Sequence, residues 1–283
     1  MAPKPPCVHD WIGRRTEARD ILQVRPARLM QATLDREPSL GEGDMLPPLW
    51  HWLYFLDACR AGDLGRDGHA RKGAFLPPVP LPRRMWAGGR LRFHAPLILG
   101  REARKRSEII AIEEKQGRSG RLCFVTVAHH VFQDVFQGDR LALSEEHDIV
   151  YREAPSPHAP VPPPLPVCEG AAFSRRVVPD AVMLFRYSAL TFNGHRIHYD
   201  AAYARAVEGY EGLVFHGPLM ATLLLDLACT QTGLQPQGFS FRGVAPVVGM
   251  RPFDLEGRQD GTALRLWAKR ADGALAMSAV AHF

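Results

Sequence analysis

Short runs of alternating hydrophobic and polar residues fill the chain between Gly89 and Arg152. This period is typical of strands that bury one face. Two of the runs, 104–115 and 121–132, flank the turn sequence 116–120 and predict an antiparallel hairpin. Further strands are predicted over 91–99 and 141–152. Ahead of them, residues 20–36 predict a helix with a break at Pro26, because proline interrupts helix interiors.

The second half repeats the order of helix and strands around one strongly apolar segment. Residues 218–230 are apolar nearly all round, which is typical of a buried helix. Pro218 suits the first turn of that helix and Gly233 suits its end. Strand-like sequence over 174–182, continuing toward residue 190, precedes it, and 198–207 predicts a short helix. Three more strands are predicted at its far side, over 238–248, 262–270 and 274–283.

Proline and glycine divide the chain into parts. Residues 154–167 are rich in proline and favour an extended spacer, so we expect one domain over 1–153 and a second over 168–283. Residues 57–89 are rich in Gly, Pro and Arg and predict a long loop, which is often functional or mobile. The aromatic cluster in 44–56 predicts core packing, or the lining of a binding groove.

Composition narrows the class of protein. The 283 residues carry a net charge of +5, and the five cysteines form no C-x-x-C pair, so neither a zinc site nor a disulfide framework is indicated. The chain has no apolar run of membrane-spanning length and no secretory signal at its start, so we expect no membrane association and a cytoplasmic protein. No nucleic-acid-binding pattern is present, and the basic balance fits either a solvated surface or a phosphate-bearing ligand such as coenzyme A.

Chemically capable side chains concentrate in residues 185–222, beside the apolar helix. His198 is a natural general acid–base, because the ordinary pKa of histidine lies near working pH. Gly217 lacks a side chain and precedes Pro218, so its N–H at the helix start could polarise a carbonyl oxygen. His195 and His216 favour structural or gating roles. The spacing of the histidines does not match a helical metal motif, so no metal site is expected.

This region carries a family resemblance. Thr191–His198 reads T-F-N-G-H-R-I-H and Phe215–Leu219 reads F-H-G-P-L, which resembles the MaoC-like (R-specific) enoyl-CoA hydratases of the hot-dog fold. The match is closer to the branch of hydroxyacyl-thioester dehydratases type 2 and mesaconyl/itaconyl-CoA hydratases. One position departs from the family pattern, because Asn193 stands where the family has a catalytic Asp. An amide cannot act as a base at neutral pH, so Asn193 could position water while His198, alone or helped by Asp200, moves the proton.

The resemblance implies an α+β double hot dog, in which each half wraps an antiparallel sheet around a helix. It also implies catalysis in the second half by His198, Asn193 and Gly217, with the first half supporting the coenzyme A arm. No cofactor is expected beyond the coenzyme A of the substrate, and a homo-oligomer is compatible with the family. The residues expected to contact substrate are Tyr187, Thr191, His195, Arg196, His216 and Arg242.

Several functions share these motifs. The resemblance favours hydration of a short branched dicarboxylic enoyl-CoA, itaconyl-CoA or mesaconyl-C4-CoA, to citramalyl-CoA. The alternatives are a 3-hydroxyacyl-thioester dehydratase of fatty-acid synthesis, a non-catalytic thioester-binding module, which the Asn193 departure favours, and a thioesterase. A cation facing the acyl end would single out a dicarboxylic substrate, and Arg196 and Arg242 are the sequence candidates.

Overall fold

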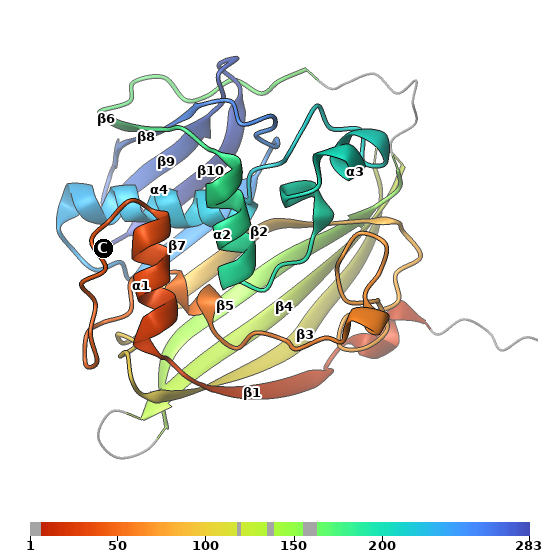
Figure 1. Ribbon diagram of the computed structural model, residues 1–283, viewed down its shortest axis with the longest axis horizontal. Coiled ribbons are helices and arrows are strands. Elements are labelled where there is room, and N and C mark those ends of the chain that lie inside the picture. Colours follow the sequence, from red (N-terminus) through yellow and green to blue (C-terminus); the bar gives the residue numbers. More distant parts are fainter. Residues whose placement is uncertain (1–6, 118–119, 135–138, 155–162) are drawn as a thin grey trace, which may run out of the picture.

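In the computed structural model, the ten strands of the described residues join into one antiparallel sheet, in the order β1-β3-β4-β5-β2-β7-β10-β9-β8-β6 (Figure 1). The structure describes residues 7–117, 120–134, 139–154 and 163–283. The strands are β1 (Arg15–Ile21), β2 (Arg83–Phe93), β3 (Glu102–Gly117), β4 (Gly120–Asp134), β5 (Asp139–Arg152), β6 (Phe173–Val177), β7 (Gly238–Gly243), β8 (Phe253–Asp260), β9 (Ala263–Lys269) and β10 (Leu275–His282).

The two halves of the chain meet in the middle of this sheet. β2 pairs with β7, with Gly88 opposite Arg242 and Arg92 opposite Gly238. The long predicted hairpin is confirmed as β3 and β4, with its turn residues 118–119 outside the described residues. The predicted spacer falls mostly on 155–162, also outside the described residues, so the domain boundaries stay a prediction.

The predicted buried helix is α4 (Gly217–Thr232), which lies against the strands of the second half (Figure 1). Nine of its sixteen residues are buried, which is why its sequence is apolar nearly all round. Gly233 ends the helix with φ 68°, a left-handed conformation that glycine adopts without strain. The described residues also form the helices α1 (Val24–Thr33), α2 (Ala181–Leu190) and α3 (Ala201–Ala206), and the short 3₁₀ helices η1 (Val8–Trp11), η2 (Trp50–Leu53), η3 (Ala61–Asp63) and η4 (Arg196–His198).

Three local predictions were wrong. The helix predicted over 20–36 is shorter, because residues 20–21 belong to β1, which pairs with β3, and α1 begins at Val24; Pro26 does not break it, since it lies inside the first turn, where its missing N–H costs nothing. Residues 181–190 form α2 instead of a strand, because Asp180 caps the helix by accepting a hydrogen bond from the N–H of Met183 at 2.7 Å. β8 was not predicted, since its sequence is largely polar.

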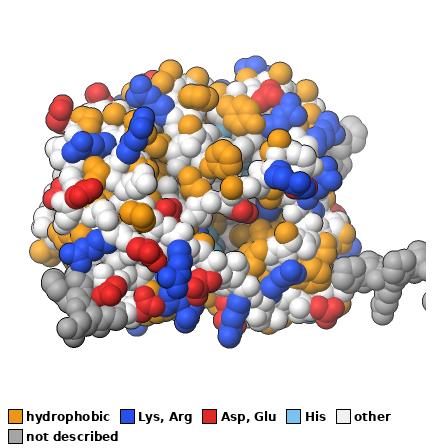
Figure 2. Space-filling view, turned by 60° about the horizontal axis from the view of Figure 1, so that its bottom comes forward, with side chains coloured by type: hydrophobic (Ala, Val, Ile, Leu, Met, Phe, Trp, Pro, Cys, Tyr) orange, Lys and Arg blue, Asp and Glu red, His pale blue; other side chains and the backbone are white. Residues whose placement is uncertain are grey.

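Among its described residues, the first half carries no helix like α4 over its strands, which differs from the expected central helix in each half. η2, the irregular segment 54–82 and α2 cover the strands β2 to β5 instead, and they leave a cavity. Among the described residues, no helix combines the length and the apolar character needed to cross a membrane. Acidic and basic side chains are interspersed on the face in Figure 2, without one dominant basic patch.

Candidate active site

A cavity of about 850 Å³ lies between the two halves of the chain. β2 to β5 contribute its polar wall, the segment 51–70 contributes a second wall, and α2 with the following loop contributes the third. The aromatic cluster of 44–56 serves both predicted purposes. Trp50 and Leu53 are buried in the core, whereas His51, Trp52 and Phe55 line the cavity.

The loop after α2 presents Asn193 to the cavity. Phe192 adopts φ 49°, and the N–H of Asn193 donates to the Ser188 carbonyl at 2.8 Å, which turns the chain back. The Asn193 Oδ1 accepts a hydrogen bond from the His195 N–H at 3.0 Å. The Asn193 Oδ1 is therefore occupied by a backbone N–H, and the Nδ2 group remains available as a donor. Asn193 can therefore hold an oxygen atom of substrate or water but cannot take a proton from it.

His198 is held as a neutral base. Its Nδ1 donates to the Val214 carbonyl at 2.7 Å, so the Nε2 is left as an acceptor. Burial lowers the pKa of His198 to about 4, since the charged form would lose its water. His198 is not among the residues that line the cavity, whereas its neighbours Asn193, Gly194 and Tyr199 are.

His216 supports His198 from behind. The two rings stack with centroids 3.7 Å apart and an interplanar angle of 19°. His216 is fully buried, its Nε2 shares a hydrogen bond with the Ser188 hydroxyl at 2.9 Å, and burial lowers its pKa well below the ordinary value. A neutral ring packed in this way fits the structural role expected from the sequence.

Gly217 is the first residue of α4, directly after His216. Its N–H has no acceptor within the helix, as is general for the first turn, and it lies at the positive end of the helix dipole. A β-carbon placed on Gly217 would meet no atom within 4 Å, and its φ is not in the positive range. The space beside the Gly217 α-carbon is therefore open, although the cavity lining includes Pro218 and not Gly217 itself.

The other predicted contact residues divide into two groups. Tyr187 and Thr191 line the cavity, although the Thr191 hydroxyl donates to the Tyr187 carbonyl at 2.7 Å. Arg196 and Arg242 do not line it. Arg196 pairs with Asp200 at 2.7 Å, and Arg242 is exposed on β7. Asp200 caps α3 through the N–H of Tyr203 at 2.9 Å, so this carboxylate is already occupied and does not line the cavity.

A second chemically capable group comes from the long loop and was not predicted residue by residue. Asp67 and His69 are joined by a hydrogen bond of 2.8 Å between Oδ2 and Nδ1, and His69 lines the cavity. The His69 ring lies 4.2 Å from the ring of His195, which is 5.4 Å from that of His198. Ligand atoms of Asp67, His69 and His195 lie within 4.8 Å of one another, close enough to admit a cation. The spacing Asp67-Gly68-His69 was the signal in the sequence, because a carboxylate two residues from a histidine can orient its ring.

The polar wall of the cavity is built around Glu145. This buried carboxylate accepts hydrogen bonds from His51 at 3.0 Å, Trp52 at 2.9 Å and His147 at 2.5 Å. These donors hold the pKa of Glu145 well below its usual range against the opposing effect of burial. Two cations also line the cavity, Arg84 and Lys105, and neither has a carboxylate of the described residues within ion-pair distance.

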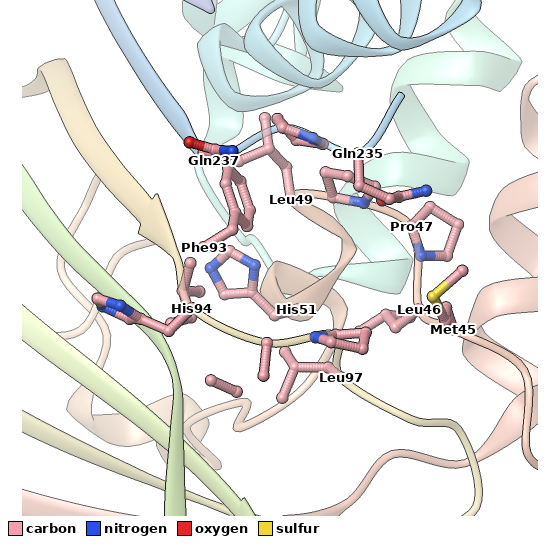
Figure 3. Close-up of a pocket in the computed structure, with 16 residues that line it drawn as sticks. Met45, Leu46, Pro47, Leu49, His51, Phe93, His94, Leu97, Gln235 and Gln237 are labelled. Atoms are coloured by element: carbon pink, nitrogen blue, oxygen red, sulfur yellow. The ribbon is translucent and has the colours of Figure 1, made fainter. Parts of the chain in front are cut away.

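A separate pocket of about 340 Å³ lies beside Leu46, Leu49 and Phe93 (Figure 3). His51 lines both this pocket and the larger cavity. The smaller pocket contains none of the motif residues, so the larger cavity is the candidate active site.

Comparison with known proteins agrees with this placement. The model of the family "hydroxyacyl-thioester dehydratase type 2" matches residues 49–249, which include the cavity-lining loop and the motif loop. The chain belongs to this family. Its members and relatives are named hydratases and dehydratases, so this is a family of hydro-lyases.

Among curated relatives, the mesaconyl-C(4)-CoA hydratase of Chloroflexus aurantiacus is 49% identical over 273 residues, covering 95% of each chain. A mitochondrial hydroxyacyl-thioester dehydratase type 2 of Schizosaccharomyces pombe is 28% identical, covering 89% of this chain and 92% of its own. Among solved structures, a MaoC-like dehydratase of Phytophthora capsici superposes with a TM-score of 0.71 at 11% identity, covering 98% of each chain. A Mycobacterium tuberculosis protein described as having a double hot-dog fold gives 0.60 at 14% identity, covering 98% of this chain and 97% of its own. The fold is therefore the expected double hot dog.

Proposed function

We propose that this protein is an acyl-CoA hydratase that adds water to mesaconyl-C4-CoA and forms citramalyl-CoA. The observation that carries the proposal is the 49% identity, over 95% of both chains, to a protein named for that reaction. Coenzyme A enters as part of the substrate. A cytoplasmic location and a homo-oligomeric state belong to the same proposal.

The motif residues support hydration in a direct way. The water oxygen bonds to the β-carbon of the enoyl thioester, and the double-bond electron pair moves toward the thioester oxygen. The Gly217 N–H is the donor available to that oxygen at the start of α4. Asn193 can orient the water through Nδ2, and the His198 Nε2 can accept a hydrogen bond from it. An acid–base group of the site carries the proton that the water loses to the α-carbon as the enolate collapses, so one water adds across the double bond.

Arg84 supports a substrate with a free carboxylate. In mesaconyl-C4-CoA the carboxylate is attached to the carbon that receives water, so its cation must lie at the catalytic end of the cavity. Arg84 lines the cavity, and its charge acts on Asp67, His69 and His195. Lys105 instead acts on His129. Arg84 is therefore the better partner, in place of Arg196 and Arg242. Itaconyl-CoA carries its carboxylate on the same carbon and remains a candidate substrate.

A dehydratase of fatty-acid synthesis is the second candidate, because the family model and the yeast relative carry that name. The substrate of such a dehydratase differs from mesaconyl-C4-CoA in its acyl group, since a fatty acyl chain has no free carboxylate that a cation could bind.

Initial rates of hydration over mesaconyl-C4-, itaconyl- and crotonyl-CoA test the function. We expect wild type to prefer mesaconyl-C4-CoA, and Arg84→Met to lose at least about tenfold in kcat/KM for it while keeping crotonyl-CoA activity. Arg92→Gln is the matched control, an exposed arginine on the same strand. A wild-type preference for crotonyl-CoA or a longer acyl group would favour the dehydratase instead.

A further inference from the structure

The motif loop has no carboxylate at position 193 and offers one free proton acceptor. Asn193 occupies that position, and its Oδ1 is engaged by the His195 N–H. The remaining acceptor of the motif, the His198 Nε2, belongs to a ring that lies behind the cavity lining and has a neutral carbonyl as its partner. A neutral partner stabilises an imidazolium less than a carboxylate does.

His69 has the properties that His198 lacks. It lines the cavity directly, and its Nδ1 donates to the Asp67 Oδ2 at 2.8 Å. A carboxylate only accepts hydrogen bonds, so this contact fixes the proton on Nδ1 and leaves Nε2 as an acceptor. The Asp67 Oδ1 also accepts the His69 N–H at 3.1 Å, so the pair is held at two points.

Close backbone contacts hold this pair against the motif loop. The Arg196 N–H donates to the Asp67 carbonyl at 2.9 Å. Gly68 has φ 88°, and a β-carbon there would lie 1.9 Å from the Gly194 oxygen. Only glycine fits this approach. The loop is therefore built to rest on Gly194, the residue after Asn193.

We propose that the Asp67–His69 pair supplies the acid–base group that the motif lacks at Asn193, with His69 as a catalytic residue and Asp67 as its positioning residue. This inference rests on the proposed function. His69 Nε2 takes a proton from the attacking water as the C–O bond forms and the double-bond pair moves to the thioester oxygen. Asp67 stabilises the resulting imidazolium. As the enolate collapses, the α-carbon takes the proton from His69, so one water adds across the double bond and the pair returns to its starting state.

His69→Asn tests this role cleanly. The asparagine amide can replace Nδ1 as donor to Asp67, which preserves the loop, and removes the base. We expect kcat for mesaconyl-C4-CoA to fall at least about a hundredfold with KM changed much less, the usual scale for a general base. The informative partner is His69→Asn with Asn193→Asp, which places a carboxylate in the motif loop. This double variant should recover at least about tenfold over His69→Asn, with a pH–rate profile shifted to lower pH.

Controls separate the base from the loop. His94→Gln removes an exposed histidine that is hydrogen-bonded to Ser144 at 2.9 Å outside the large cavity, and should behave as wild type. Asp67→Asn should lower kcat and change the pH–rate profile, which a loss of loop packing alone would not do. Thermal unfolding of each variant identifies misfolding, and His69→Gln replaces His69→Asn if that variant unfolds.

Three results would overturn the inference. One is a His69→Asn enzyme within threefold of wild-type kcat. Another is a double variant no more active than His69→Asn. The third is wild-type activity that is lost on dialysis against a chelator and restored by zinc, which would make Asp67, His69 and His195 metal ligands. A wild type that hydrates no enoyl-CoA would overturn the proposed function together with this step, whereas an active wild type with an equally active His69→Asn overturns this step alone.

Discussion

His198 shows how surroundings set the chemistry of one residue. A free histidine is partly protonated near neutral pH, whereas burial keeps this ring neutral with a pKa of about 4. The hydrogen bond to the Val214 carbonyl then places the ring proton on Nδ1. His216 is also a histidine, but its role is structural, because its Nε2 is hydrogen-bonded to the Ser188 hydroxyl and its ring is fully buried. The sequence motif alone does not separate these two roles, since the separation depends on Val214 and Ser188.

We expect His198→Ala to lower kcat for hydration by at least about a hundredfold, because it removes the hydrogen-bond acceptor of the motif loop that helps to hold the water while His69 takes its proton. Substrate binding should change less than turnover. Steady-state kinetics with mesaconyl-C4-CoA measures both, and a thermal unfolding curve checks that the cavity left beside His216 is tolerated. A variant that keeps near-normal kcat would remove His198 from the proton chemistry.

Elements differ in how far the sequence determines them. α4 was predictable because its residues are apolar on every face and its ends carry Pro218 and Gly233. The β3–β4 hairpin was predictable from its alternation. β1 and α2 were not, since their state depends on pairing with β3 and on the cap at Asp180. The close approach of Gly68 to Gly194 joins segments far apart in the chain, so the sequence around either glycine does not predict it.

The start of α4 yields a test of the oxyanion hole. Gly217 is not held at positive φ, and an added β-carbon has open space, so a side chain there should not disturb the folded protein. It should intrude where the thioester oxygen must lie. We expect Gly217→Val to lose at least about a hundredfold in kcat, the scale of one oxyanion donor, with the unfolding temperature nearly unchanged.

Thr230→Val on the exposed side of the same helix is the control for helix stability. Kinetics and thermal unfolding are measured on the same preparation. An active Gly217→Val enzyme would contradict the oxyanion role, and Gly217→Ala supplies the smaller intrusion if the valine variant is unstable.

At the scale of the molecule, the site depends on both halves of one continuous sheet. The second half supplies the motif loop and α4, while the first half supplies the cavity wall, Arg84 and the Asp67–His69 pair. Several histidines are buried at or near this site. A site that excludes water removes the solvation that a charged imidazole ring needs, so these rings stay neutral. Keeping these rings neutral should make the free energy of unfolding depend on pH.

Burial lowers the pKa values of His69, His129, His195, His198 and His216. In the unfolded chain these rings titrate near their ordinary pKa of about 6.5. Below that pH the unfolded state binds protons that the folded state does not, so the free energy of unfolding falls as the pH falls. Each ring contributes up to about 1.4 kcal/mol per pH unit until its folded pKa is reached.

We therefore expect the unfolding temperature to drop by several degrees between pH 7.5 and pH 5.5 at constant ionic strength. Carboxylates with lowered pKa values, such as Asp67 and Glu145 at the site, stay ionised over this range and do not oppose the trend. Thermal unfolding followed by circular dichroism at closely spaced pH values measures the slope. His129→Gln should reduce this slope, because the ring lines the cavity from β4 and its pKa is lowered well below the ordinary value. An unfolding temperature that stays level or rises toward pH 5.5 would show that the rings are solvated in the folded protein, and would contradict the neutral state on which the acceptor roles of His69 and His198 depend.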